Sequence, residues 1–334
     1  MKKIEQVWEE IESEIATTAP VRSGGGLLTR LATPEYGQRL RVGVEWPSRT
    51  RILIFSAGET ALPPRTSWPE CKCLELLLER TGDGQATLIV RLRDARGRDV
   101  FTSLAEDLAR RAVGGSEVEA ARRVLAALAR WQRFLAATGR SLSNESRRGL
   151  WGELKVLQDV IAPVIGIDAA VDAWRGPAGA PQDFQHQGTA VEVKTRAARS
   201  PAVVRISGEQ QLHDTPWKDL FLAHVAVDEQ EGSGETLPQR IAAVRKSVAG
   251  SSAAELFEDG LLDAGWLEAE EEKHRTRGFF VRELGFFRVA EGFPKLTPPL
   301  LPQGVGGLAY DLSLDAAMPY AVKADAVREA LESL

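Results

Sequence analysis

The chain has 334 residues and a net charge of −5, and 43% of its residues are apolar. This length suits about two or three domains, and the apolar content suffices for a buried core. The sequence holds no run of about 18 apolar residues, so we expect no membrane span, and its start, MKKIEQVWEEIESEI, lacks the apolar stretch of a signal peptide. Its two cysteines, Cys71 and Cys73, are too few for a zinc site. We therefore expect a cytoplasmic protein that contacts no membrane.

The negative net charge argues against a protein that coats nucleic acid along its whole surface, because phosphate contacts dominate such binding. Any basic surface must be local, and the middle third of the chain is the best candidate for one. An ordinary solvated face is the alternative explanation of these cations. The residues are Arg140, Arg147, Arg148, Lys155, Lys194, Arg196, Arg199 and Arg205.

Residues 1–115 are predicted to form a mixed, β-rich N-terminal region. A helix over about 3–16 precedes a glycine break at 24–26, and several short apolar segments follow, with a hairpin turn at 82–84. This region contains no catalytic constellation and no phosphate-binding glycine loop. A connecting helix over 116–139 comes next, and the Ser116/Glu119 pair predicts a capping box at its start.

Residues 140–230 carry the chemically informative pattern. A helix, GLWGELKVLQDVIAPVIG, is expected to end or kink at Pro163. It is followed by two short strands (QDFQH and TAVEVKT), a strand AVVRIS, a short helix GEQQLHD and a strand LFLAHVAVD. The segment GSGETLP is predicted to be a linker. Residues 231–334 are then expected to form an α+β region with helices near 238–248 and 252–262 and a strand pair, FFVREL and FRVA.

Glu153 stands out on the helix of this central region. Leu150, Leu154, Leu157 and Val160 share one face of that helix, and Glu153 lies on the same apolar side. A carboxylate on an apolar face is costly unless it is paired, hydrogen-bonded or bound to a metal. Glu153 is therefore a candidate site residue, and an ion pair with a nearby arginine is the alternative.

The two strands that follow bring further charged residues together. Glu192 and Lys194 are two apart, so they share one face of a strand. A two-residue turn at Gln187 and Gly188 would pair the strands so that Asp183 lies opposite Glu192, with Cβ atoms about 5 Å apart. Two like charges in that position should destabilise a hairpin unless a cation lies between them.

Magnesium suits this pair, because it prefers oxygen ligands and is usually held by one or two carboxylates. Lys194 could deprotonate an attacking water, or position it and stabilise the charge that grows on a phosphate. Two neighbouring carboxylates favour the charged lysine, so we prefer the second role.

The order of these motifs resembles a known superfamily. Asp183, then Glu192-Val193-Lys194 nine residues later, after a helix bearing Glu153, resembles the PD-(D/E)XK nucleases. The segments GLWGELKVL, WRGP, DF, VEVKT and ISGEQQL, and the tail GFPKLTPPLLPQGVGGLAYDLSL, are similar to a bacterial member family found in phage-defence gene clusters. One departure is that Gln182 separates Pro181 from Asp183. The proline shapes a turn and performs no chemistry, so the motif tolerates this change.

The resemblance implies an α/β core within an overall α+β chain, a restriction-endonuclease-like mixed sheet flanked by helices with additional N- and C-terminal α+β regions. It implies Asp183, Glu192, Val193 and Glu153 as the metal site, Lys194 as the catalytic lysine, and Gln211, at the start of the next helix, beside the metal or water. The implied cofactor is Mg²⁺, with Mn²⁺ able to replace it. The implied function is Mg²⁺-dependent endonuclease cleavage of DNA in a defence or restriction system, with protein partners from that system.

A rival hypothesis is an inactive nuclease-like fold that serves as a DNA-binding or scaffold subunit. The repulsive carboxylate pair favours the enzyme, because a scaffold need not keep it. The oligomeric state is left open. Trp174 and Arg175, in the loop before Asp183, are the best candidates for contacting substrate. The histidines show no spacing suited to a metal and are expected to be structural; they are His186, His213, His224 and His274.

Overall fold

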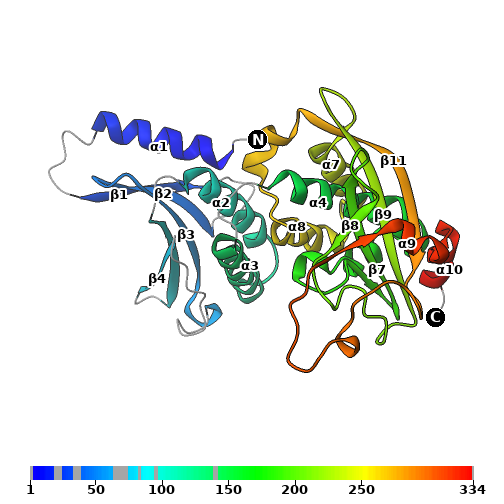
Figure 1. Cartoon of the computed structure of the whole chain (residues 1–334). Helices are drawn as coiled ribbons and strands as arrows, with labels where there is room; N and C mark the ends of the chain where they lie inside the picture. Colours follow the sequence, from blue (N-terminus) through cyan, green and yellow to red (C-terminus); the bar gives the residue numbers. More distant parts are fainter. Residues whose placement is uncertain are drawn as a thin grey trace. The chain divides into compact units, whose positions relative to one another are not determined.

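The computed structural model describes residues 3–18, 25–32, 39–62, 74–81, 84–93, 97–137 and 142–332. The chain divides into two compact units. The first contains residues 1–140 and 267–269, and the second contains residues 141–266 and 270–334. Figure 1 shows the elements of both. Cys71 and Cys73 lie outside the described residues.

The first unit is built on an antiparallel five-stranded sheet with the order β1-β2-β3-β5-β4. Strands β4 and β5 pair so that Thr81 lies opposite Gln85, on either side of the predicted hairpin turn, of which residues 82 and 83 lie outside the described part. Helix α3 begins with the predicted capping box, in which Ser116 and Glu119 bond one another's backbone N–H groups. The elements are α1 (Ile4–Thr18), β1 (Gly26–Leu31), β2 (Leu40–Trp46), β3 (Thr50–Gly58), η3 (Glu59–Ala61), β4 (Leu74–Thr81), β5 (Gln85–Leu92), α2 (Arg98–Ala112) and α3 (Glu117–Ala137).

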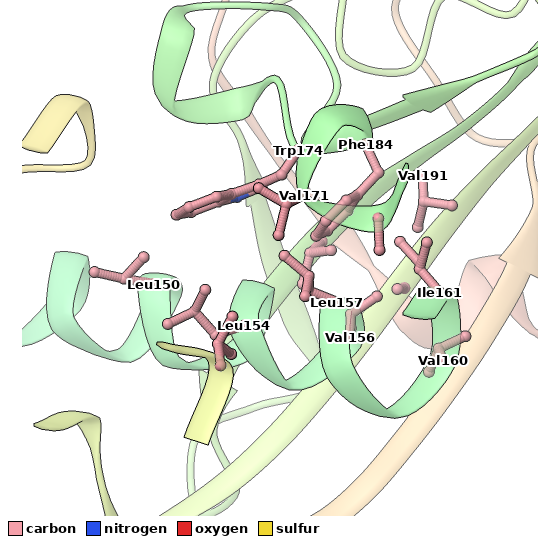
Figure 2. Close-up of a cluster of buried hydrophobic side chains, with 14 of the residues drawn as sticks. Leu150, Leu154, Val156, Leu157, Val160, Ile161, Val171, Trp174, Phe184 and Val191 are labelled. Atoms are coloured by element: carbon pink, nitrogen blue, oxygen red, sulfur yellow. The ribbon is translucent and has the colours of Figure 1, made fainter. Parts of the chain in front are cut away.

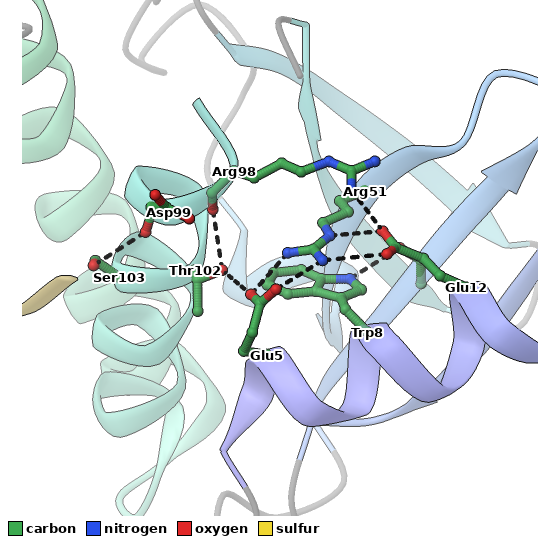
Figure 3. A network of polar contacts seen from close by, with 9 residues as sticks. Glu5, Trp8, Glu12, Arg51, Arg98, Asp99, Thr102 and Ser103 are labelled. Atoms are coloured by element: carbon green, nitrogen blue, oxygen red, sulfur yellow. Dashed lines mark hydrogen bonds and ion pairs between the residues drawn. The ribbon is translucent and has the colours of Figure 1, made fainter. Parts of the chain in front are cut away.

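A buried arginine ties α1 to this sheet. Arg51 on β3 is 2% exposed, and its guanidinium donates to Glu5 at 2.8 Å and to Glu12 at 2.9 Å. The same guanidinium lies 5.0 Å from the ring centre of Trp8 (Figure 3). A buried charge of this kind is tolerated only when it is fully paired. The network therefore explains the packing of α1 and is structural.

The second unit is organised around a mixed sheet with the order β10-β11-β9-β7-β6, in which β7 and β9 are parallel and β13 pairs with β11. A separate two-stranded ribbon joins β8 to β12. The strands are β6 (Phe184–His186), β7 (Thr189–Ala197), β8 (Val203–Ile206), β9 (Asp219–Glu231), β10 (Glu235–Thr236), β11 (Arg277–Arg288), β12 (Tyr310–Ser313) and β13 (Ala321–Val322).

Helices cover one face of this sheet and the ribbon covers the other. Side chains of α4, η6, α6, α7, α8 and α10 form a buried cluster with β7 and β9, of which Figure 2 shows part. On the opposite face Ala190 and Leu222 pack with Ile206 of β8 and Leu312 of β12. The helical elements are α4 (Asn144–Val156), η6 (Leu157–Ile161), α5 (Ala162–Ile165), α6 (Ile167–Ala173), η7 (Gly176–Ala178), α7 (Leu237–Ser247), α8 (Ala253–Asp263), η8 (Glu268–His274), η9 (Pro298–Leu300), α9 (Leu314–Ala317), η10 (Met318–Tyr320) and α10 (Ala324–Glu332).

The helix that carries Glu153 continues past the predicted break. Residues 157–161 form a π-helical turn, in which Ala162 donates its N–H to the carbonyl of Leu157. Pro163 then lies in the first turn of α5, where its missing N–H does little harm. Widening the helix before the proline keeps the chain helical to Ile165.

Three expectations differ from the structure. Segment FFVREL and the first two residues of FRVA belong to one strand, β11, which has an irregularity between Val281 and Glu283. Residues 209–212, expected to be helical, form turns. Strand β9 pairs with β11 along most of its length, so residues after 231 extend the core sheet instead of forming a region of their own. Burial of both faces of β9 accounts for this pairing.

The structure contains no helix, among the residues it describes, that is long and apolar enough to cross a membrane.

Candidate metal and catalytic site

A tight hairpin sets the register of the candidate residues. His186 pairs with Thr189 and Phe184 with Val191, as the sequence predicted. Gln187 and Gly188 both have positive φ, +42° and +86°, as a type I′ turn requires. The next step of this register places Asp183 opposite Glu192, just beyond the end of β6.

Glu192 is almost fully buried, and only one of its two carboxylate oxygens has a partner among the described residues. Its side chain is 1% exposed, and Oε1 lies 2.7 Å from Lys194 Nζ in an ion pair. Oε2 is buried and has no hydrogen-bond partner within the described part of the chain. An unpaired buried carboxylate oxygen costs several kcal/mol or more. A cation bound at this oxygen would remove that cost.

Asp183 lies immediately before the first residue of β6, beside the part of β7 that extends past β6. Its Oδ2 accepts a 2.7 Å hydrogen bond from the N–H of Val193. Because the N–H and C=O of one strand residue leave on the same side, the carbonyl of Val193 faces the same edge of β7. This edge therefore offers the carboxylate of Asp183 and one backbone oxygen together.

The loop before Asp183 packs directly against it. Backbone N–H groups of Arg175 and Gly176 donate to the carbonyl of Asp183 at 2.8 and 3.0 Å. A Cβ at position 176 would lie 2.4 Å from Asp183 Oδ1. Only glycine permits this approach, so the WRGP segment fixes Asp183 from outside the sheet.

Glu153 approaches the same edge from α4. Its Oε2 accepts a 2.8 Å hydrogen bond from Trp174 Nε1. Trp174 is 5% exposed and packs 5.9 Å from the ring of Phe257. The expectation that Trp174 contacts substrate is therefore wrong, because its indole is used inside the protein to hold Glu153. Within the described residues, Glu153 forms no ion pair with an arginine.

Lys194 and Gln211 form the opposite side of the site. Lys194 Nζ donates to Gln211 Oε1 at 3.1 Å, and the backbone N–H of Ser207 donates to the same oxygen at 2.8 Å. The resemblance placed Gln211 beside the metal or water at the start of a helix, whereas in the structure Gln211 bonds Lys194 and lies in a turn. Its carbonyl oxygen positions Lys194, which Glu192 holds from the other side.

Burial, and for Glu153 and Glu192 also the charge of Asp183, raises the pKa values of the three carboxyl groups. Burial raises the pKa of Glu153 to about 8 and that of Asp183 to about 6. The pKa of Glu192 rises well above its ordinary value, first through burial and then through the charge of Asp183. Lys194 opposes all three shifts. Glu153 and Asp183 keep some exposure to solvent, which moderates the effect of burial.

In EDTA, the protein should lose stability as the pH rises from about 4 to about 8. The folded-state pKa of Asp183, about 6, and that of Glu153, about 8, exceed those of an unfolded chain. Protons held only by the folded form stabilise it at low pH and are lost as the pH passes those values. Thermal melts of wild type and of the double variant Asp183→Asn/Glu153→Gln test this. The variant should show a flatter pH dependence, and an equal slope would contradict the assignment.

Close packing of α4 on β7 positions Glu153. A Cβ at Gly152 would lie 1.8 Å from Thr195 Oγ1. We expect Gly152→Ala to destabilise the protein by about 1–3 kcal/mol, because α4 must shift away from β7. Gly149→Ala, on the same helix, meets nothing within 4 Å and should be neutral or stabilising by up to about 1 kcal/mol. Urea denaturation compares the two, and equal stabilities would contradict this packing role.

The predicted basic surface is largely neutralised within the protein. Arg147 and Arg148 pair with Glu229, Lys155 with Asp159 and Arg205 with Asp311. Arg196 donates to His224 and to three backbone carbonyls. Arg140 lies outside the described residues. The cations that the sequence suggested for phosphate contacts are thus mostly held by other partners.

The donor set suits an ion that keeps several of its waters. Across the described ranges, no three His, Cys, Asp or Glu side chains are arranged to hold a metal by themselves. Asp183, the free oxygen of Glu192 and the carbonyl of Val193 remain as donors, all of them oxygens. Magnesium is usually bound by one or two carboxylates and water, so these residues fit it. The protein would supply only part of the coordination.

One neighbour of this site, Tyr310, has no signal in the sequence. Tyr310, on β12, hydrogen-bonds the N–H of Leu296 through its hydroxyl at 3.1 Å. Burial raises the pKa of its phenol, and the positive charge of Lys194 lowers it. The lysine and the tyrosine are therefore within electrostatic reach, although they are 116 residues apart in sequence. No local pattern in the sequence signals this proximity.

Comparison with known proteins identifies the family of the chain. A family model described as "Putative PD-(D/E)XK family member, (DUF4420)" matches residues 4–315. Comparison with the curated proteins finds no significant match, and comparison with the solved structures finds none. The mixed sheet with flanking helices agrees with a nuclease-like α/β fold within an α+β chain. Because the model spans most of the chain, the chain belongs to this PD-(D/E)XK family.

Proposed function

We propose that the protein is a Mg²⁺-dependent endonuclease that hydrolyses phosphodiester bonds of DNA in the cytoplasm. The observation that carries this proposal is the buried carboxylate of Glu192, which has one oxygen on Lys194 and the other without a partner among the described residues. Asp183 stands beside it, and family membership associates this pattern with nucleases. A purely structural carboxylate would be expected to have both oxygens satisfied.

The residues divide into a metal-binding group and a lysine group. Asp183, Glu192 and the carbonyl of Val193 would hold the ion, and Glu153 would bind through one of its waters or support Asp183 from behind. Mg²⁺ bound there would supply charge stabilisation at a phosphate oxygen and a more acidic water. Mn²⁺ should replace it, since it accepts the same oxygen ligands.

Lys194 would act on the phosphate. Its ammonium is held between Glu192 and Gln211, an arrangement that preorganises a positive charge before substrate arrives. A fixed charge aimed at the developing negative charge contributes most in the transition state. Gln211 keeps Lys194 in place through its Oε1, and its amide nitrogen is then available to a water or a phosphate oxygen.

The isolated protein should hold DNA weakly. The net charge is −5, and several central cations are committed to ion pairs. Phosphate contacts supply most non-specific affinity, so few such contacts remain. We infer that other subunits of a multi-gene defence or restriction system load the DNA, raising its effective concentration at the site.

The competing function is that of an inactive nuclease-like subunit that binds DNA or partners. Nicking of supercoiled plasmid at about 50 mM salt distinguishes the two. Wild type should convert the plasmid to open-circular and linear forms with Mg²⁺ or Mn²⁺ and not with EDTA, and Glu192→Gln should be inactive. The assay is repeated with the proteins of the neighbouring genes added. If wild type and Glu192→Gln are then equally inactive with either ion, the scaffold function is favoured.

A further inference from the structure

An uncharged, apolar loop stands next to the lysine side of the site. Residues 296–308, LTPPLLPQGVGGL, contain no charged side chain, and we call them the apolar loop. Leu300 is 63% exposed, Val305 48% and Leu296 41%. In Figure 1 this segment lies in the orange-to-red stretch between β11 and β12. A group of large exposed apolar side chains on one loop is a candidate binding surface.

Both ends of the apolar loop are fixed to elements of the candidate site. At its start, the N–H of Leu296 donates to the hydroxyl of Tyr310, which the charge of Lys194 reaches. At its end, the N–H groups of Gly307 and Leu308 donate to Glu209 at 3.2 and 3.0 Å. Glu209 lies in the same turn as Gln211, which bonds Lys194. The base of the loop is therefore held beside the lysine.

The chemistry of the apolar loop suits bases better than phosphates. It offers no cation for the DNA backbone, whereas leucine, proline and similar side chains are the ones that proteins insert between base steps. The prolines at 298, 299 and 302 limit its backbone freedom, so that it can enter a duplex at little entropic cost. Because nearby cations are paired within the protein, non-ionic contacts would have to supply part of the affinity for DNA.

We propose that the apolar loop inserts Leu300 and Val305 between base steps of duplex DNA next to the phosphate to be cleaved. This proposal rests on the proposed function, since it assigns the substrate contact of the same site. A duplex whose phosphate reaches Lys194 lies against the anchors of the loop, which is why we choose DNA over a protein partner as its occupant. Unstacking then bends the duplex toward the carboxylates.

The test uses the double variant Leu300→Ser/Val305→Ser. With Mg²⁺, it should cleave intact duplex at least about tenfold more slowly than wild type, because unstacking a base step costs a few kcal/mol. On a duplex with a short mismatched bubble, where the step is already unstacked, both proteins should cleave at similar rates. Val281→Ser is the matched control, because Val281 is an exposed valine far from the site. It is 37% exposed on β11 and pairs with Val227 of β9. Val227 lies about 16 Å along β9 from Leu222, which pairs with Glu192.

A second readout follows unstacking without cleavage. In a Lys194→Met background, a duplex carrying 2-aminopurine at several adenine positions should brighten severalfold on binding, and the added loop substitutions should remove that rise. If the loop substitutions leave duplex cleavage and fluorescence unchanged, the loop contacts a protein partner instead and the proposal is overturned. Equal slowing on duplex and bubble would also overturn it. Absence of cleavage of any DNA by wild type, with the proteins of the neighbouring genes present, would overturn the proposed function itself, which the loop variants alone cannot do.

Discussion

Lys194→Met should lower the rate of DNA cleavage by about 10²–10³-fold, the usual effect of removing one preorganised donor to a developing negative charge. Divalent-ion affinity should remain within a few-fold of wild type, because the ion's proposed ligands are oxygens of Asp183, Glu192 and Val193. Loss of rate with retained ion binding is the signature of an interaction made mainly in the transition state. Single-turnover cleavage and calorimetry with Mn²⁺ measure the two quantities.

Lys155→Met is the matched control for this variant. Lys155 is also a partly exposed lysine that pairs with a carboxylate, Asp159, but it lies on α4. It should cleave at a rate close to wild type. If Lys194→Met cleaves as fast as Lys155→Met, Lys194 has no part in the chemistry.

Asp183→Asn should stabilise the metal-free protein by about 1–3 kcal/mol at pH 8 and abolish its stabilisation by Mg²⁺. The raised folded-state pKa of Asp183, about 6, corresponds to at most about 3 kcal/mol of destabilisation once the carboxyl is ionised, and partial exposure reduces that value. Asparagine can still accept the hydrogen bond from Val193 while removing the charge. Wild type should gain about 1.4 kcal/mol at an ion concentration ten times the dissociation constant.

Melting curves at pH 8, with EDTA and with millimolar Mg²⁺, measure both effects. Asp311→Asn is a suitable control, because Asp311 is an exposed carboxylate paired with Arg205 on the ribbon. It should keep the ion-dependent shift of wild type. A lower melting temperature for Asp183→Asn in EDTA would show that no repulsion is relieved at this position, and the crowded-carboxylate interpretation would fail.

Local patterns predicted the hairpin that carries the acidic residues. Alternation along β7 placed Glu192 and Lys194 on one face, and the register proposed from a two-residue Gln-Gly turn is the one that the structure has. The helical position of Glu153 was equally readable, because three- and four-residue spacing marks an apolar face. These features depend on residues close in sequence, where spacing and turn chemistry determine the geometry.

Contacts between distant segments could not be predicted in the same way. Trp174 holds Glu153, and Gly152 allows α4 to touch Thr195, yet neither residue belongs to a pattern that names its partner. The residues at 209–212 were expected to form a short helix, but they form turns. Glu209 bonds residues 307 and 308 instead, nearly a hundred positions away, and tertiary hydrogen bonds replace helical ones.

The distribution of unpaired charge on the surface was the property least predictable from the sequence. The arginines and lysines of the middle third looked like a basic strip, but folding brings carboxylates to them: Glu229 reaches Arg147 and Arg148 from β9, and Asp311 reaches Arg205 from β12. A linear sequence shows where cations occur and not which anions will neutralise them. For the proposed function, the consequence is that few cations of the middle third remain for contacts with the DNA backbone.

The central claim is that Asp183, Glu192 and Val193 form a divalent-ion site. Calorimetric titration of Mn²⁺ into wild type and Glu192→Gln at pH 8 tests it most directly, because glutamine keeps the shape of the side chain and removes the charge at the unpartnered oxygen. We predict saturable Mn²⁺ binding by wild type and its loss in Glu192→Gln, with both proteins equally folded by circular dichroism. Equal binding by the two proteins, or no binding by either at millimolar Mn²⁺, would contradict the claim.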